Sequence, residues 1–146
     1  MKMSFSIECI DTYGLATFYA HIGIPKPNLQ ILDGAKYLQS CERVLCCFDT
    51  GANQTAISKS ISDKLQLPTK ESNIHIQSIN SHTASEEKWA GICLPNNFVI
   101  ASIPVTVVDL GLNPIELNIG MDIISLGQLA LFRKDGKLTL SFSVDS

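Results

Sequence analysis

The chain has 146 residues, of which 45% are hydrophobic and 17% are charged, a composition typical of a single globular domain over residues 1–146. Eleven lysines and arginines stand against 14 acidic residues, which leaves a net charge of −3 and no basic run, so nucleic-acid binding is not expected. No apolar stretch reaches the roughly 18 residues of a membrane span. Because Glu8 precedes any signal-type apolar block, we expect a soluble, cytoplasmic protein with no membrane partner.

The N-terminal third of the sequence has short apolar segments that alternate with a period of two residues, which indicates strands. Residues 3–10 and 16–24 are the first two predicted strands. Turn-forming residues follow at 25–28 and 33–34. A nearly unbroken apolar run at residues 44–48 then predicts a strand that is buried on both faces.

A helix is predicted after this run, because Ile57, Ile61 and Leu65 recur every four residues and Pro68 follows them. Alternating apolar residues then predict more strands, with a polar hairpin tip at residues 80–87. These strands are residues 74–79, 89–94, 98–101, 104–109 and 115–119.

The C-terminal part is predicted to form a second short helix and a hairpin. The helix covers residues 122–129, with Asp122 as its N-cap because a side-chain oxygen there can accept hydrogen bonds from free amides of the first turn. Residues 131–134 and 137–142 flank Asp135-Gly136, a pair typical of type I′ turns, which require positive φ at both central positions.

The five cysteines cannot form a complete set of intrachain disulfides, so we expect a reducing compartment. Cys46 and Cys47 are adjacent in a predicted strand, so their side chains point to opposite faces. Desolvation there raises the pKa of a thiol, and packing is expected rather than nucleophilic catalysis. The histidines and cysteines show no Cys-x2-Cys or His-x3-His spacing, so no metal and no cofactor are expected.

The segment 48–53, Phe-Asp-Thr-Gly-Ala-Asn, places a carboxylate where the apolar run ends. The strand would hold Asp49 on a rigid support, while Gly51 and Ala52 take little space and let a second backbone come close. Taken by itself, an ordinary Asx turn after a strand is an alternative interpretation of Asp-Thr-Gly.

Asp49-Thr50-Gly51-Ala52 after an apolar strand resembles the active-site loop of the retropepsin-like aspartic proteases. Residues 117–124, Leu-Asn-Ile-Gly-Met-Asp-Ile-Ile, are similar to the second signature of that family, in which a glycine precedes a short helix. Gly120 follows Asp49 by 71 residues, which leaves room for a flap hairpin. The resemblance implies an all-β fold, the closed acid-protease barrel with one or two short helices.

Each chain of that family supplies one such loop, so the resemblance implies a homodimer with Asp49 of both subunits as the catalytic dyad. Two carboxylates about 3 Å apart share one proton and can activate a water for attack on a peptide bond, best at mildly acidic pH. Thr50 would hydrogen-bond across the dimer axis. Gly51 and Ala52 would face the backbone of a peptide or protein substrate.

The resemblance also implies further contacts to the substrate. A hairpin at residues 76–89 would close over the substrate as a flap. Its residues Ile79, Asn80 and Ser81, together with Asn53, are predicted to bind the substrate. Gly120 and Asp122 are assigned to the structural signature, and capping is expected of Asp122 rather than catalysis.

Three features depart from the family pattern. Asn53 stands where an acidic residue or serine is common, residues 25–41 form a long connection, and the flap tip at 78–83 has no glycine. These departures leave open a second function, a dimerisation or peptide-binding module with little or no proteolysis.

Overall fold

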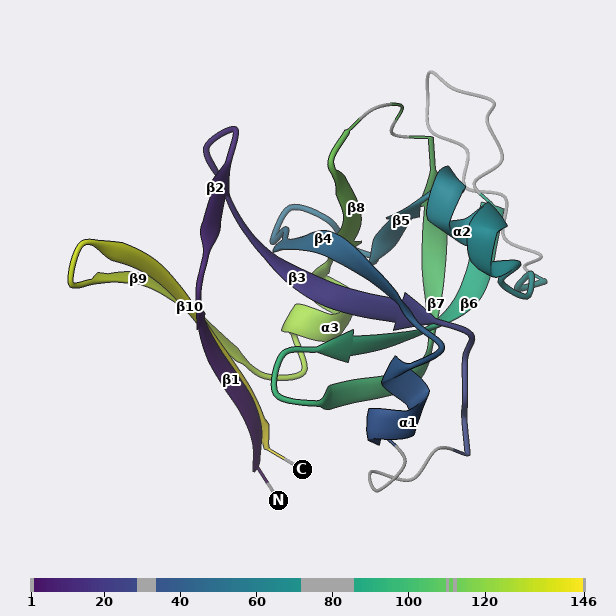
Figure 1. Cartoon of the computed structure of the whole chain (residues 1–146), viewed down its shortest axis with the longest axis horizontal. Coiled ribbons are helices and arrows are strands. Elements are labelled where there is room, and N and C mark those ends of the chain that lie inside the picture. Colours follow the sequence, from purple (N-terminus) through teal and green to yellow (C-terminus); the bar gives the residue numbers. More distant parts are fainter. Residues whose placement is uncertain (1, 29–33, 72–85, 110, 112, 146) are drawn as a thin grey trace.

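The body of the protein is a closed ring of six strands in the order β3-β4-β8-β5-β7-β6, and pairing of β3 with β6 closes it (Figure 1). The computed structural model describes residues 2–28, 34–71, 86–109, 111 and 113–145. The all-β barrel predicted from the sequence is therefore confirmed. The ring strands are β3 (Leu15–Gly23), β4 (Glu42–Phe48), β5 (Ala56–Ser58), β6 (Glu86–Leu94), β7 (Phe98–Val108) and β8 (Ile115–Ile119).

A second, three-stranded sheet lies beside the ring and joins the two ends of the chain (Figure 1). It consists of β1 (Lys2–Glu8), β10 (Lys137–Asp145) and β9 (Gln128–Lys134), with β10 in the middle. The turn between β9 and β10 has φ values of 54° at Asp135 and 77° at Gly136, which confirms the predicted turn with two positive φ angles. The short strand β2 (Ile10–Thr12) leads from this sheet to β3.

Five phenylalanines fasten the terminal sheet to the ring. Their paired ring centroids lie 5.3 to 6.4 Å apart, the range in which aromatic rings attract each other beyond simple burial. They are Phe5 on β1, Phe142 on β10, Phe18 on β3, Phe48 on β4 and Phe98 on β7. Because Phe48 is the last residue of β4, this cluster anchors the strand end that Asp49 follows.

Three short helices accompany the strands in the described residues. The predicted helix is present as α2 (Lys59–Leu65), although Ile57 belongs to β5. Ser58 caps α2, since its hydroxyl accepts a hydrogen bond from the Ile61 amide at 3.3 Å. The helix α1 (Gly34–Leu38) lies within the long connection before β4 and was not predicted, and α3 (Met121–Ile124) follows β8.

Two predicted strands, 98–101 and 104–109, are one continuous strand, β7, so their separation was wrong. Proline cannot donate to a sheet ladder, so Pro104 is a position at which a strand could end. The strand continues through this position because β5 pairs only with residues 106–108 of β7, which leaves Pro104 paired on one side, with Trp89.

The predicted helix 122–129 was also wrong in its extent, because α3 ends at Ile124 and β9 begins at Gln128. Pairing of Gln128 with Ser143 draws the chain into the terminal sheet. The connecting Gly127 lies so close to β10 that a Cβ atom there would be 2.1 Å from the Ser143 carbonyl oxygen. Sheet pairing thus replaces the last turn of the expected helix.

Candidate active site

Two sequence segments about 70 residues apart meet at one edge of the ring. Strands β4 and β8 are parallel neighbours, with Cys47 opposite Asn118 and Phe48 opposite Ile119. The Asp49 amide continues this pairing by donating to the Ile119 carbonyl at 2.7 Å. Because parallel strands end at the same edge, the loops that follow β4 and β8 lie side by side.

The Asp49 carboxylate is half-buried and is held through both of its oxygens. The Gly51 amide donates to Oδ1 at 2.9 Å, and the Asn118 side-chain amide donates to Oδ2 at 3.0 Å. The first contact is that of an Asx turn, so the local conformation matches the simpler interpretation of Asp-Thr-Gly. The second contact comes from another strand and fixes the plane of the carboxylate.

The rest of the Asp49 loop is exposed at its tip and fastened at its base. Thr50, Gly51 and Asn53 are exposed, and Ala52 is half-buried. The Ala52 carbonyl accepts from the Met121 amide at 2.7 Å, and the Asn53 carbonyl accepts from the next amide of α3 at 3.2 Å. The loop tip is therefore free for contact while its backbone is held by the start of α3.

Gly120 allows this close contact between the two loops. A Cβ atom at this position would lie 2.7 Å from the Gln54 carbonyl carbon and 2.9 Å from the Ala52 carbonyl oxygen, too near for any side chain. The glycine of the second signature is thus required by backbone packing.

Asp122 was predicted as the N-cap of the last helix, and that prediction was wrong: the N-cap position is Gly120 and α3 begins at Met121. The first amides of α3 already donate to the carbonyls of the Asp49 loop and need no side-chain cap. The Asp122 carboxylate instead accepts from the Thr55 hydroxyl at 2.7 Å and the Thr55 amide at 3.0 Å. It also accepts from the Ile123 amide at 2.9 Å.

Thr55 also holds the two loops together, and this role was not predicted from the sequence. Its side chain is fully buried, and its hydroxyl accepts from the Gly120 amide at 3.2 Å while donating to Asp122. A buried hydroxyl needs such partners, because an unpaired one is costly. Its position six residues after Asp49, between a loop and an apolar strand, was the only local signal.

The two adjacent cysteines have different surroundings. Cys46 belongs to the core, where burial raises its thiol pKa well above the ordinary value. Cys47 is buried on the other face, where its thiol donates to the Asn118 side-chain oxygen at 2.9 Å. Burial, and then the negative charge of Asp49, raise the pKa of Cys47 to about 11. The predicted raised pKa values are confirmed, whereas the contact with Asn118 was not foreseen.

Part of the predicted substrate site lies outside the described residues. Ile79, Asn80 and Ser81 belong to the segment 72–85, and of the predicted flap 76–89 only residues 86–89 are described, as the start of β6. Among the described residues, no group of three or more His, Cys, Asp or Glu side chains could hold a metal ion. Nor does any helix in that part of the chain combine the length and apolarity needed to cross a membrane.

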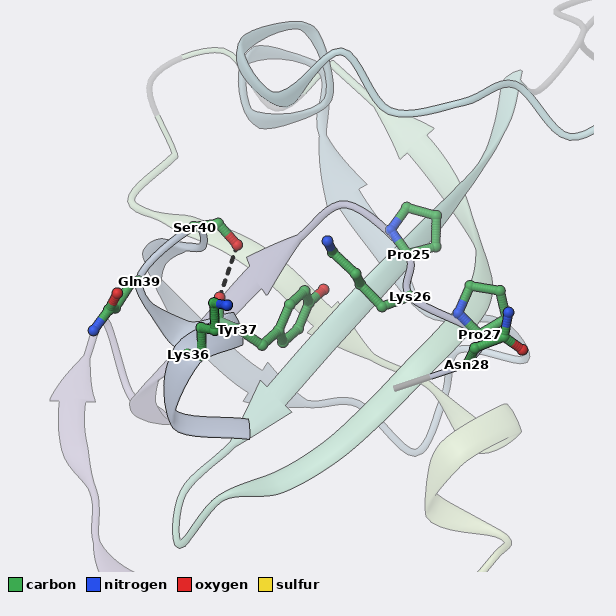
Figure 2. A pocket seen from close by; sticks show the side chains of 8 residues that line it. All are labelled: Pro25, Lys26, Pro27, Asn28, Lys36, Tyr37, Gln39 and Ser40. Atoms are coloured by element: carbon green, nitrogen blue, oxygen red, sulfur yellow. Dashed lines mark hydrogen bonds between the residues drawn. The ribbon is translucent and has the colours of Figure 1, made fainter. Parts of the chain in front are cut away.

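A cavity of about 740 Å³ lies at the long connection before β4 (Figure 2). The described residues that line it come from 25–28 and from α1 and the turn after it, and none belongs to the Asp49 loop. Tyr37 of α1 is buried there and donates to the Ile24 carbonyl at 2.7 Å, while Ser40 donates to the Tyr37 carbonyl at 2.8 Å. The described residues of the long connection therefore pack on the ring through Tyr37.

The closed barrel has a known counterpart. The crystal structure of a retropepsin-like aspartic protease from Rickettsia conorii matches with a TM-score of 0.55 at 14% identity, covering 99% of this chain and 96% of that chain. The likeness shows that the fold is retropepsin-like. The chain belongs to the aspartyl protease family, whose model matches residues 37–123.

Two other solved structures are more distant. The EIAV protease complexed with the inhibitor HBY-793 has a TM-score of 0.47 at 15% identity, covering 76% of this chain and 86% of that chain. The retroviral protease-like domain of Ddi1 from Leishmania major has a TM-score of 0.44 at 12% identity, covering 82% and 90%. No curated protein matches the sequence.

Proposed function

We propose that the protein is an aspartic endopeptidase that works as a homodimer, with Asp49 of each subunit as the catalytic pair. The observation that carries this proposal is the Asp49 carboxylate, oriented through both oxygens at the end of a rigid strand and next to an exposed Thr50-Gly51 tip. Membership of the aspartyl protease family supports the same reaction.

A second copy is needed because the chemistry requires an acid and a base in one place. Asp122, the other carboxylate near the loop, already accepts hydrogen bonds from Thr55 and Ile123. Across a two-fold axis, the second Asp49 supplies the missing group, and two close carboxylates share one proton. The pair then titrates as a unit.

The reaction follows from that shared proton. The ionised carboxylate takes a proton from a bound water, and the water oxygen bonds to the carbonyl carbon of the substrate. The protonated carboxylate gives its proton to the developing oxyanion. When the carbon–nitrogen bond breaks, the leaving amine receives a proton from the pair, so one water is consumed and no covalent enzyme intermediate forms.

The remaining site residues take roles around this pair. We assign Thr50 to contact across the dimer axis and Gly51 and Ala52 to the substrate backbone. Asn53 and the flap residues Ile79, Asn80 and Ser81 are assigned to substrate binding. Residues 1–146 act as one domain in this proposal.

The test is cleavage of a diverse peptide pool between about pH 4 and pH 7, with sedimentation of each protein. Wild type and Asp63→Asn, a matched change at an exposed aspartate of α2, are expected to cleave. Asp49→Asn is expected to remain dimeric and to cleave nothing. A dimeric wild type that binds peptides without cleaving them would overturn the protease and support a peptide-binding module.

A further inference from the structure

Asn118 lies near the end of β8, at the point where that strand reaches Asp49. Its neighbours Leu117 and Ile119 are fully buried on the opposite face of β8. Residues Cys47 and Asp49 lie two positions apart, so their side chains point to one face, and Asn118 is the cross-strand partner of Cys47. The pairing therefore places one amide between a thiol and a carboxylate.

The hydrogen bonds among these three side chains can run in one direction only. An ionised carboxylate only accepts, so the Asn118 nitrogen must face Asp49 Oδ2. The Asn118 oxygen then faces Cys47 Sγ at 2.9 Å and needs a donor there. The Cys47 thiol is that donor, because its pKa of about 11 keeps it protonated at neutral and acidic pH.

We propose that Asn118 is a positioning residue for Asp49, and that the Cys47 thiol holds the Asn118 amide in the orientation that this contact requires. The inference rests on the proposed catalytic role of Asp49. It adds to the site a polar contact from β8, which lies far from the Asp-Thr-Gly loop in the sequence.

The contact acts on the geometry of the carboxylate. Together with the Gly51 amide, it leaves Asp49 with one fixed plane, so the free lone pairs point in defined directions. Hydrogen bonds to charged groups are the stronger ones, so losing this contact is expected to lower kcat by about tenfold to a hundredfold.

The kinetic test uses Asn118→Leu, which keeps a side chain of similar size without the amide. We expect kcat to fall by about tenfold or more while KM changes by less than about twofold, since the contact acts on the reacting group. Cys47→Ala is expected to lower kcat by a smaller factor, and Cys47→Ser, which restores a donor, to recover most of it. A dimeric, folded Asn118→Leu with wild-type kcat would overturn the proposal.

A second test needs neither activity nor a change at Asn118. The side-chain NH₂ signals of Asn118 are compared by NMR at pH 7 in wild type, in Asp49→Ala, which removes the acceptor, and in Asp63→Ala, a matched change at an exposed aspartate of α2. We expect one NH signal to be shifted downfield by its hydrogen bond in wild type and in Asp63→Ala, and to lose that shift in Asp49→Ala.

The two tests separate this inference from the proposed function. Asn118 signals that depend on Asp49 but not on Asp63, in a protein that cleaves no peptide, would support the Asn118 contact and overturn the protease. Cleavage that depends on Asp49, with Asn118 signals that are the same in wild type and in Asp49→Ala, would support the protease and overturn the positioning role. If Asn118→Leu does not fold, the NMR comparison decides alone.

Discussion

The Asp49 loop and the terminal sheet are both at the surface, yet they are stabilised in opposite ways. The loop over residues 49–55 exposes its tip, while carbonyls and the buried Thr55 tie its base to α3. The terminal sheet relies on apolar contacts from one face, whereas its edge strand β9 leaves Leu131 and Phe132 55% and 41% exposed. Polar contacts thus fix the position of the loop, and apolar contacts attach the terminal sheet to the ring.

Removing a buried aromatic ring from the terminal sheet should have the largest effect. Phe142 is fully buried in the five-phenylalanine cluster, so Phe142→Ala is expected to lower the free energy of unfolding by about 3 to 5 kcal/mol. The matched control Phe132→Ala, on the exposed edge strand, should cost less than about 1 kcal/mol. Urea denaturation measures both, and equal losses would contradict attachment through the buried face.

The polar support of the loop is tested by Thr55→Val, which keeps the shape and removes the hydroxyl. Asp122 loses a donor and the Gly120 amide loses an acceptor, so we expect a loss of about 2 to 3 kcal/mol. Thr139→Val in the terminal sheet, where the described residues provide no side-chain hydrogen bond for the threonine, should change stability by less than about 0.5 kcal/mol. Equal losses of stability for the two variants in urea would contradict the conclusion that polar contacts stabilise the loop more than the terminal sheet.

Alkaline pH should weaken the site strand more than the terminal segment. Burial raises the pKa of Cys47 from 9.0 to about 11, so its contribution to stability is present below pH 9 and is lost as the pH rises through 11. We expect a loss on the order of 1 to 2 kcal/mol between pH 8 and pH 11, reduced in Cys47→Ser. Cys9→Ser, at a half-buried thiol, is the control and should keep most of the loss.

The smallest effect is expected at the free edge of the terminal sheet. In the proposed homodimer, a second copy is the partner that would cover the exposed apolar side chains of β9. Leu131→Asp should then weaken dimerisation by about tenfold, because it places a charge in an apolar contact. Sedimentation over a concentration series measures this, with Gln128→Asp on the same strand as control. Dimerisation unchanged by Leu131→Asp would place the interface elsewhere.

Most strands could be predicted from the sequence because their signals are local. Strand β8 matches its predicted residues 115–119, and the Asp135-Gly136 turn follows from the demand for positive φ. The errors arise where a distant segment decides the structure. Pro104 stays in β7 because β5 is short, and α3 ends early because β9 pairs with β10.

Contacts between distant segments limit the prediction of the candidate site even more than that of the strands. Asp49 and Gly120 can be found from their short motifs, since each motif is contiguous. The contact of Asn118 with Asp49 depends on the parallel register of β4 and β8, which period-two alternation does not encode. The role of Asp122 likewise depends on Thr55, which lies 67 residues earlier in the chain. Local preference for a helix cap was therefore misleading there.

The parallel pairing of β4 with β8 has a consequence for the newly synthesised chain. Asp49 is translated long before Asn118, Gly120 and Asp122, which supply the supports of its loop. Bringing such distant segments together is slow compared with closing a hairpin. A nascent chain that has not yet reached residue 118 thus carries its aspartate without the second strand that orients it, which delays assembly of the site until residues 118–122 have been made.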